Sequence, residues 1–464
     1  MGAASSLFFS SNDSEKQTLH RRCTPSNDQF DEQQDRWNSL ARHFVTDLKE
    51  RSGYPIRTWL QGSYKFGTQI RPVRKSEEFD IDLGIYFQWE GSPSEGNHTP
   101  NKLKSFVQDS LLAYAKNDSD EVVEVCDQKP RCGRIRYKDD FHIDVPSYHL
   151  DDSKDARTLA AEEGWEISDP KAIYLWFKDS FDDATRTKVR RQVRYLKVWA
   201  ALKFAEIKKR PSSILLTVLV AEAANSIGAS NIGSDDETLR DIVDAIIDRL
   251  NNDRSVLNPV NLAENLVRLS NAEMNVFQAE LDTLWDVAQR GTAAESEWSA
   301  ADIWQEAFEY LFPLPEGTEA ILEKSRNLPA PITMPEIKVT ARPRSNNFVK
   351  PIVSMNRIGP IPKNCDIEFE ILNSSNLPRN CEIIWIVRNE GREAEQVNDL
   401  GHVKKQGLKV DETSAYKGTH FMDCFVKLRG QTIAMRRVPV TIVGQEMPPR
   451  NPKKPAWTAL RGHR

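Results

Sequence analysis

The chain of 464 residues has 39% hydrophobic and 28% charged residues, and its formal net charge is −5 at pH 7. This length predicts two or three domains, and the composition excludes disordered and fibrous classes. No apolar run approaches the roughly 18 residues that span a bilayer, and the first residues lack the features of a secretory signal. Six scattered cysteines without a Cys-x-x-Cys pair favour reduced thiols. We therefore expect a cytoplasmic protein without a membrane segment.

The charge is unevenly distributed along the chain. From Glu336 to the end there are 22 Lys and Arg residues against 13 Asp and Glu residues, whereas the preceding part has 41 against 55 and a net charge of −14. A basic end on an acidic body favours an anionic contact for that end. An ordinary surface fluctuation explains the difference about equally well.

The first 170 residues mix helical and strand patterns. Residues 1–28 are polar, and we expect a flexible N-terminus. Apolar residues at helical spacing predict helices over 30–51 and 103–115. Strict alternation predicts a strand over 79–89, and short apolar runs separated by turns predict three more strands within 121–150.

After about Pro170 the pattern becomes helical, and it changes again near the end. Helices are predicted over 186–204, 212–224, 235–250, 272–290 and 296–311. Six prolines within 313–347 predict a linker. The strand-like runs that follow predict a small β-sandwich over 348–445, and residues 446–464 form a basic, proline-rich tail.

Two carboxylates share one face of the strand over 79–89. Asp80 and Asp82 are two residues apart, so that both side chains project in the same direction. Their repulsion is costly unless a cation lies between them, and hard divalent cations prefer oxygen ligands. Asp144 supplies a third carboxylate from another predicted strand. Three such carboxylates can hold two Mg²⁺ ions, with Mn²⁺ as a substitute, for phosphoryl transfer, and Asp144 could also polarise the attacking hydroxyl.

A Gly-Ser pair follows the apolar stretch that ends at Gln61. Gly62 lets the backbone approach a ligand closely, and Ser63 would begin a helix whose free N–H groups meet phosphate oxygens. We therefore expect Gln61, Gly62 and Ser63 to bind the phosphates of a nucleotide. Each signal alone is common, because Asp-x-Asp usually marks a solvated strand edge. Together, their order and spacing resemble the polymerase-β-like nucleotidyltransferase superfamily.

Within that superfamily the resemblance narrows to one family. The segments GSYKFGTQIRP, EFDIDLGIYF and FHIDVPSY look like the bacterial cGAS/DncV-like nucleotidyltransferases, which make cyclic oligonucleotide signals. The segments RRQVRYLKVWAALK and RPSSILLTVLVAEA are similar to that family's paired helices.

In those helices a Lys before a Trp and a later Ser reach the triphosphate. The resemblance therefore implies this role for Lys197 and for Ser213 or Ser212, with Arg194 as a weaker candidate. An exposed helix charge is the alternative interpretation of Lys197.

The last predicted domain resembles the adenylate/guanylate cyclase and SMODS-associated (AGS-C) sensor domain. The resemblance rests on WIVRNEGREA and ETSAYKGTHFMDCFV. Trp385, Tyr416 and His420 within these segments are either sandwich core and turn residues or ligand contacts.

The two resemblances imply an α+β protein, with a polymerase-β-like nucleotidyltransferase core, a helical lobe and a small C-terminal β-sandwich. The expected boundaries are 29–170 for the catalytic lobe, 171–312 for the helical lobe, 313–347 for the linker and 348–445 for the sensor domain.

The implied activity is the Mg²⁺-dependent condensation of ATP, with or without GTP or another NTP, into a cyclic di- or trinucleotide. Pyrophosphate would be released, and the product would activate a separate effector in antiphage defence (CBASS). A regulatory protein encoded nearby is an expected partner. The bases and the 2′–5′ or 3′–5′ linkage stay open, as does nucleic-acid binding.

Two alternatives remain at this point. One is an enzyme of the same fold that makes linear 2′–5′ oligoadenylate or modifies RNA or protein; the net charge of −14 over residues 1–335 argues against long RNA. The other is a binding module in which the sensor domain carries the function. That alternative would expect a damaged acidic triad, whereas Asp80, Asp82 and Asp144 are all present.

Overall fold

The computed structural model describes residues 2–12, 17–74, 77–117, 121–138, 141–315, 333–344, 350–404 and 407–446. The chain divides into two compact units, Met1–Phe308 and Glu309–Arg464. Among the residues described, no helix combines the length and the apolar character needed to cross a membrane. An α+β architecture with a strand-rich C-terminal unit is confirmed.

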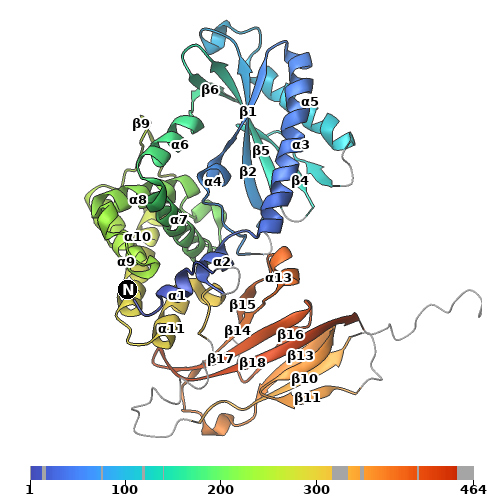
Figure 1. Cartoon of the computed structure of the whole chain (residues 1–464), viewed down its shortest axis with the longest axis vertical. Helices are drawn as coiled ribbons and strands as arrows, with labels where there is room; N and C mark the ends of the chain where they lie inside the picture. Colours follow the sequence, from blue (N-terminus) through green and yellow to red (C-terminus); the bar gives the residue numbers. More distant parts are fainter. Residues whose placement is uncertain are drawn as a thin grey trace, which may run out of the picture. The chain divides into compact units, whose positions relative to one another are not determined.

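A mixed seven-stranded sheet forms one half of the first unit (Figure 1). Five strands have the order β1-β2-β5-β4-β3, and β6 pairs with β5 and with β7. Only the β2–β5 pairing is parallel within this sheet. The strands are β1 (Ile56–Gln61), β2 (Phe79–Gln88), β3 (Val122–Val125), β4 (Cys132–Tyr137), β5 (Phe141–Asp151), β6 (Ala156–Ala161) and β7 (Gly164–Ile167).

Two long helices, α3 (Asn27–Ser52) and α5 (Pro100–Asn117), pack against one face of this sheet. Alternation along β2 places Ile81 and Leu83 in the core beneath them. Because successive strand residues point to opposite faces, the side chains of Asp80 and Asp82 must lie on the other face of the sheet. The hydrophobic core thus fixes the direction in which the acidic pair points.

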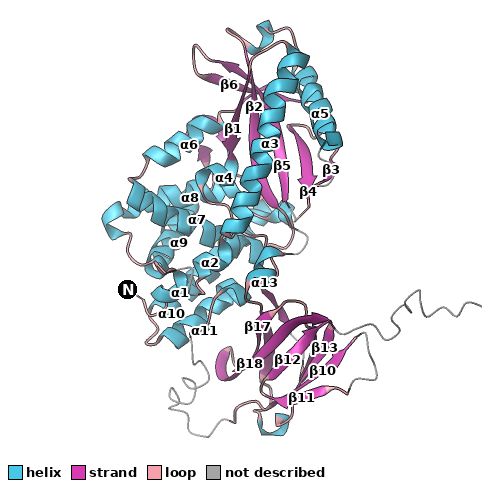
Figure 2. Cartoon of the chain, turned by 45° about the vertical axis from the view of Figure 1, so that its right-hand side comes forward, coloured by secondary structure: helices cyan, strands magenta, loops and turns pink. Residues whose placement is uncertain are grey.

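Helices make up most of the rest of the first unit (Figure 2). They are α1 (Ser5–Phe8), α2 (Leu19–Cys23), α4 (Gly62–Phe66), α6 (Pro170–Asp179), α7 (Asp183–Lys203), α8 (Ser213–Ile227), α9 (Asp235–Asn252), α10 (Asn271–Thr292) and α11 (Glu297–Phe308), with a hairpin of β8 (Leu257–Asn258) and β9 (Asn261–Asn265) before α10. The predicted helices are confirmed to within a few residues at their ends.

The N-terminal residues differ from the expectation of a flexible segment. The side chain of Phe8 is fully buried, and its ring lies 5.4 Å from that of Tyr195 and 4.8 Å from that of Trp304. The backbone of Cys23, at the end of α2, accepts a hydrogen bond from Arg71 N at 2.8 Å. A few apolar residues in a polar stretch are enough to anchor it, because each buried aromatic removes a large apolar area from water.

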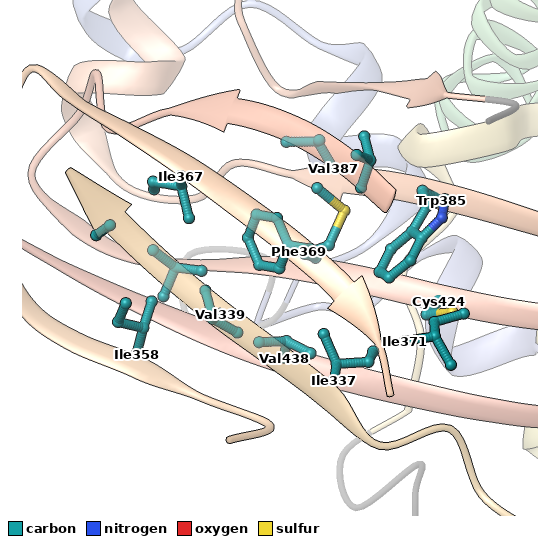
Figure 3. Close-up of a cluster of buried hydrophobic side chains, with 14 of the residues drawn as sticks. Ile337, Val339, Ile358, Ile367, Phe369, Ile371, Trp385, Val387, Cys424 and Val438 are labelled. Carbon is teal, nitrogen blue, oxygen red and sulfur yellow. The ribbon is translucent and has the colours of Figure 1, made fainter. Parts of the chain in front are cut away.

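The second unit is a β-sandwich. One sheet has the order β11-β10-β13-β16 and the other β12-β18-β17-β14-β15. The strands are β10 (Ile337–Pro343), β11 (Ile352–Met355), β12 (Ile358–Lys363), β13 (Cys365–Ile371), β14 (Glu382–Arg388), β15 (Gly401–Lys404), β16 (Lys409–Thr413), β17 (Gly418–Leu428) and β18 (Gln431–Glu446), with short helix α13 (Arg392–Gln396) after β14. Figure 3 shows side chains from the two sheets, Phe369 and Trp385 among them, meeting in one core.

One strand of the sandwich lies where the prolines predicted a linker. β10 pairs with β13 from Ile337 to Pro343, and Val339 is buried in the sandwich core. The alternation of Ile337, Val339 and Ala341 is a strand pattern that the neighbouring prolines mask in sequence. The part of the linker at 316–332 and 345–349, and the tail at 447–464, lie outside the described residues.

A buried ion network holds the start of this unit. The Asp423 carboxylate has no exposed surface and accepts hydrogen bonds at 2.8 Å from Arg388 Nε and Arg437 Nε. Arg388 also donates to the backbone oxygens of Tyr310 and Phe312. Burial acts to raise the pKa of Asp423, but the charges and hydrogen bonds of the two arginines outweigh it and lower that pKa.

Candidate active site

The parallel register of β2 and β5 gathers the predicted carboxylates. Asp82 is the register partner of Asp144, and Asp80 is the partner of His142. The side chains of Asp80 and Asp82 on β2, and of His142 and Asp144 on β5, all project from the face opposite α3 and α5. Within each strand the two residues are two positions apart and therefore share a face. The structure therefore brings Asp80, Asp82 and Asp144 together, as the sequence predicted.

Gly62 approaches one of these carboxylates closely. It follows β1 with φ of +56°, in the left-handed region that favours glycine. A Cβ atom at this position would lie 1.9 Å from Asp82 Oδ2. The turn from β1 into α4 therefore requires glycine, and its backbone lies directly against the acidic pair.

Basic side chains contact two of the carboxylates. Arg134 on β4 binds Asp144 through two hydrogen bonds, one of them 2.8 Å from Nη2 to Oδ2. His142 Nε2 lies 3.0 Å from Asp80 Oδ1. The other ring nitrogen of His142, Nδ1, lies 2.8 Å from Glu78 Oε2, so that Glu78 fixes the orientation of the ring.

The electrostatic environments of the two neighbouring aspartates differ. Burial, followed by the negative charges of Asp80 and Asp144, raises the pKa of Asp82 well above its ordinary value. Desolvation also acts to raise the pKa of Asp80, but the hydrogen bond and charge of His142 and the charge of Arg134 outweigh it and lower that pKa. A bound cation would therefore stabilise the ionised form of Asp82 more than that of Asp80.

The cluster has the chemistry of a metal site. Asp80, His142 and Asp144 each offer one ligand atom, and these three atoms lie within 4.8 Å of one another. The closely placed, mutually repelling carboxylates fit a divalent cation with oxygen ligands, which would neutralise them.

A cavity of about 670 Å³ opens beside the cluster within the first unit. It is lined by residues from the loop before β2, from the sheet, and from the helical half: Ser63, Gln69, Ile70, Arg71, Pro72, Glu77, Glu78, Asp80, Arg134, His142, Lys197, Ile207, Lys208, Arg210, Pro211, Ser212, Ser213, Arg268 and Leu269. Predicted site residues from both halves thus face one space of the size that a nucleotide requires.

Lys197 is buried, in contrast to the alternative of an exposed helix charge. Its Nζ donates to Thr68 O at 2.9 Å, and its side chain lines the cavity. Burial, followed by the charge of Arg194, lowers the pKa of Lys197 to about 7, although Asp80 and Asp82 act in the opposite direction. An anionic ligand in the cavity would favour the charged ammonium.

The two candidate serines lie at the start of α8. Ser212 is the N-cap residue, and its hydroxyl accepts a hydrogen bond from Leu215 N at 3.3 Å. Ser213 is exposed to the cavity, where the first turn of the helix presents free N–H groups. Both serines line the cavity, and the Ser212 hydroxyl also caps the helix, which favours Ser213 as the hydroxyl that binds a ligand.

Five candidates are not among the described residues that line the cavity: Gly62, Asp82 and Asp144, which belong to the acidic cluster beside it, and Gln61 and Arg194, whose side chains bind elsewhere. The buried Gln61 amide donates to Tyr86 Oη at 2.8 Å and accepts from Tyr148 Oη at 3.2 Å. Its side chain therefore packs beneath a stacked tyrosine pair. Arg194 donates from Nε to Gln69 O at 3.2 Å, and burial lowers its pKa to about 10.

His142, Glu78 and Arg134 also contact the carboxylates or each other, although the sequence did not single them out. His142 precedes Asp144 by two residues, so strand alternation already places both on one face. Glu78 and Arg134 carried no comparable signal, because their roles depend on which strands become neighbours.

In the second unit, the three singled-out residues are part of the packing. Trp385 is fully buried in the sandwich core, and its Nε1 donates to Gly407 O at 3.1 Å. His420 is buried, and its Nε2 lies 2.8 Å from Tyr416 O. Tyr416 donates its hydroxyl to Asp399 at 2.7 Å. These contacts favour the core and turn interpretation over ligand contacts.

The sheet with acidic residues on adjacent strands, facing a helical half across a cavity, defines a nucleotidyltransferase of the polymerase-β-like type. Residues 56–148 match the family model of the cyclic GMP-AMP synthase DncV-like nucleotidyltransferase domain. Residues 316–443 match the adenylyl/guanylyl and SMODS C-terminal sensor domain. These matches confirm both resemblances: the chain carries a DncV-like nucleotidyltransferase domain and a C-terminal AGS-C sensor domain.

One curated relative is similar over nearly the whole chain, and another over half of it. A cyclic GMP-AMP synthase of Escherichia albertii is 29% identical over 443 residues, which cover 94% of this chain and 96% of that protein. A c-di-GMP synthase of Roseivirga ehrenbergii is 26% identical over 264 residues, covering 50% of this chain and 65% of that protein.

A solved structure of Vibrio cholerae DncV cyclic AMP-GMP synthase with the linear intermediate pppA(3′,5′)pG has a TM-score of 0.55 at 18% identity, covering 67% of this chain and 96% of that one. The same enzyme with nonhydrolysable GTP also has a TM-score of 0.55, at 19% identity, covering 68% of this chain and all of that one. At this identity the structural likeness establishes the shared fold.

Proposed function

We propose that this enzyme joins nucleoside triphosphates, ATP with or without GTP or another NTP, into a cyclic di- or trinucleotide and releases pyrophosphate at each bond. The observation that carries the proposal is the placement of three carboxylates on adjacent strands, of which Asp80 lines a cavity together with Ser63 and Lys197. Similarity to a cyclic GMP-AMP synthase over 94% of the chain supports it.

Asp80, Asp82 and Asp144 would hold two Mg²⁺ ions, and Mn²⁺ can substitute because it accepts the same oxygen ligands. Bound there, the ions would neutralise the charge on the triphosphate and on the attacking and leaving oxygens. The fit rests on burial and on the repulsion among these carboxylates, which together raise the pKa of Asp82.

The chain's own residues bind and orient the reactants in this proposal. The backbone at Gly62 and the hydroxyl of Ser63 bind phosphate oxygens at the start of α4, while Lys197 and Ser213 bind the triphosphate from the helical half. Gln61 supports this turn through its two tyrosine contacts and does not itself reach the phosphates.

In each round, the ribose hydroxyl oxygen of one nucleotide forms a bond with the α-phosphorus of another. The bond from that phosphorus to the oxygen leading to the β-phosphate breaks, and pyrophosphate leaves. The hydroxyl proton passes to a carboxylate oxygen of Asp144. For this, Arg134 must release at least one of the two Asp144 oxygens that it binds. A final intramolecular round closes the ring.

The biological role in this proposal is bacterial antiphage signalling of the CBASS type, in the cytoplasm. The cyclic product would act on a separate effector, and a regulatory protein encoded nearby would control the enzyme. The AGS-C domain would respond to the activating signal.

The proposal is tested by measuring pyrophosphate release from ATP and GTP with Mg²⁺, with Mn²⁺, and with a chelator. The wild-type enzyme should release pyrophosphate only with a divalent cation, and the double variant Asp80→Asn with Asp82→Asn should release none while staying folded by circular dichroism. Wild-type rates in that double variant would refute the site. Products that require added RNA or protein would favour the alternative acceptors.

A further inference from the structure

Two adjacent acidic residues before Asp80 bind opposite halves of the first unit. Glu77 Oε1 accepts a hydrogen bond from Arg210 Nη2 at 2.6 Å, in a pair whose side chains are 12% and 17% exposed. Glu78 instead binds His142 within the sheet. Arg210 lies between α7 and α8. The Glu77 contact therefore joins the start of β2 to the helical half.

The same region holds the C-terminal end of α7. Arg74 Nη2, from the loop before β2, donates to the backbone oxygens of Ala201 and Leu202 at 3.2 and 2.9 Å. Arg210 donates to Phe204 O from Nε at 3.2 Å and from Nη2 at 3.1 Å. The last carbonyls of a helix lack partners within it, and cationic groups are favourable there. The guanidinium groups of Arg74 and Arg210 thus connect the end of α7 to the loop that leads into β2.

This connection lies between the two elements that carry the proposed binding residues. Lys197 is on α7, one helical turn before Ala201, and Asp80 is three residues after Glu77. Lys197, Asp80, Glu77 and Arg210 all line the one cavity. A shift of α7 relative to β2 would separate the ammonium from the carboxylates while leaving each half intact.

We propose that Glu77, through its ion pair with Arg210, is a positioning residue that sets Lys197 on α7 against the carboxylates on β2, so that a nucleoside triphosphate contacts both together. This inference rests on the proposed function of the cavity. Because Asp80, Asp82 and Asp144 all belong to the sheet, their spacing does not depend on the Glu77–Arg210 pair. Cation binding without nucleotide and triphosphate binding should therefore respond differently to its loss.

The test compares the full-length wild-type chain with Glu77→Gln. Mn²⁺ binding without nucleotide, followed by electron paramagnetic resonance, should keep the wild-type Kd. The Kd of a nonhydrolysable ATP analogue with Mg²⁺, measured by calorimetry, should rise about tenfold, which corresponds to about 1.4 kcal/mol. Arg210→Lys keeps the charge but loses the planar guanidinium group. Its Kd for the analogue should lie between those of the wild type and Glu77→Gln.

Glu306→Gln is the matched control. Glu306 pairs with Arg290 at 2.7 Å on α11 and α10, and this pair does not line the cavity. Its removal should leave analogue binding unchanged. The exchanged variant Glu77→Arg with Arg210→Glu should recover part of the lost affinity, so that the double-mutant cycle reports a coupling between the two positions.

The inference is overturned if Glu77→Gln binds the analogue as the wild type does, or if it weakens Mn²⁺ binding by the same factor. In the second case Glu77 would act on the carboxylates themselves. If the wild-type protein binds no analogue at all, the proposed function fails together with the inference, which separates that result from a failure of positioning alone.

Discussion

Replacing Asp82 by Asn should abolish activity and yet stabilise the metal-free enzyme. Burial and the charges of Asp80 and Asp144 both disfavour the ionised Asp82 carboxylate. As a general scale, two like unit charges roughly 5 Å apart repel by about 3 kcal/mol at an effective dielectric constant near 20. Arg134 and Lys197 oppose part of this repulsion, so the net gain from removing the charge should be about 2 kcal/mol.

The neighbouring Asp80 provides the contrast. Its charge is favoured by the contact of Oδ1 with His142 Nε2 at 3.0 Å, so Asp80→Asn should lose a favourable interaction and gain no stability. Both variants should lose activity, because each removes a proposed ligand. The effect on stability thus separates the two residues although the effect on activity does not.

Thermal unfolding in the presence of a chelator measures this difference. For a unit of this size, about 2 kcal/mol corresponds to a rise of about 4 °C in the midpoint for Asp82→Asn. Added Mg²⁺ should raise the midpoint of the wild type and leave that of Asp82→Asn unchanged. An Asp82→Asn variant that melts below the wild type in chelator would refute the reasoning, since the carboxylate would then be favourably placed without a cation.

Three further predictions address the turn, the sandwich and the boundary between the units. Gly62→Ala should reduce kcat about 100-fold, because the added Cβ displaces the Asp82 carboxylate by about 1 Å or more; a rate near that of the wild type would show that the turn adapts. Asp423→Asn should destabilise the second unit by about 3 kcal/mol at pH 7 in urea unfolding. Because its pKa is lowered by its two arginine partners, the stability from Asp423 is present above the ordinary carboxyl pKa of about 4 and is lost as the pH falls through the lowered value, so the variant should show a flatter acid-side profile, and equal profiles would contradict this. A chain ending at Phe308 should be soluble and helical by circular dichroism, whereas one ending at Ala341 should aggregate, because it keeps most of strand β10 without its partner strands; equal solubility would contradict that division.

The direction of the three carboxylates could be predicted from strand alternation, since Asp80, Asp82 and Asp144 sit in strands whose apolar residues alternate clearly. Their meeting depends on the parallel pairing of β2 with β5, which alternation does not predict. The requirement for glycine at position 62 could also be predicted from the sequence, but the group that the glycine approaches could not. Sequence indicated a close approach to a ligand, whereas the structure places Gly62 against Asp82.

The residues that sequence misjudged depend on contacts between distant segments. Gln61 looked like part of the phosphate turn, but two tyrosines from β2 and β5 hold its amide. Phe8 lay in a polar stretch, and the distant helices α7 and α11 contribute the aromatic side chains that pack against it. The pair of Glu77 and Arg210 joins positions 133 residues apart. The periodicity of residues within one helix or strand does not indicate partners from such distant segments.

Mass spectrometry of the phosphatase-resistant product from wild-type enzyme, Mg²⁺ and a mixture of all four NTPs tests the central claim most directly. The account predicts a species with the mass of a cyclic di- or trinucleotide, which has no terminal phosphate for the phosphatase to remove, and predicts its absence with Asp80→Asn and Asp82→Asn combined. A product that phosphatase degrades to a linear oligonucleotide, or one that the double variant still forms, would contradict it.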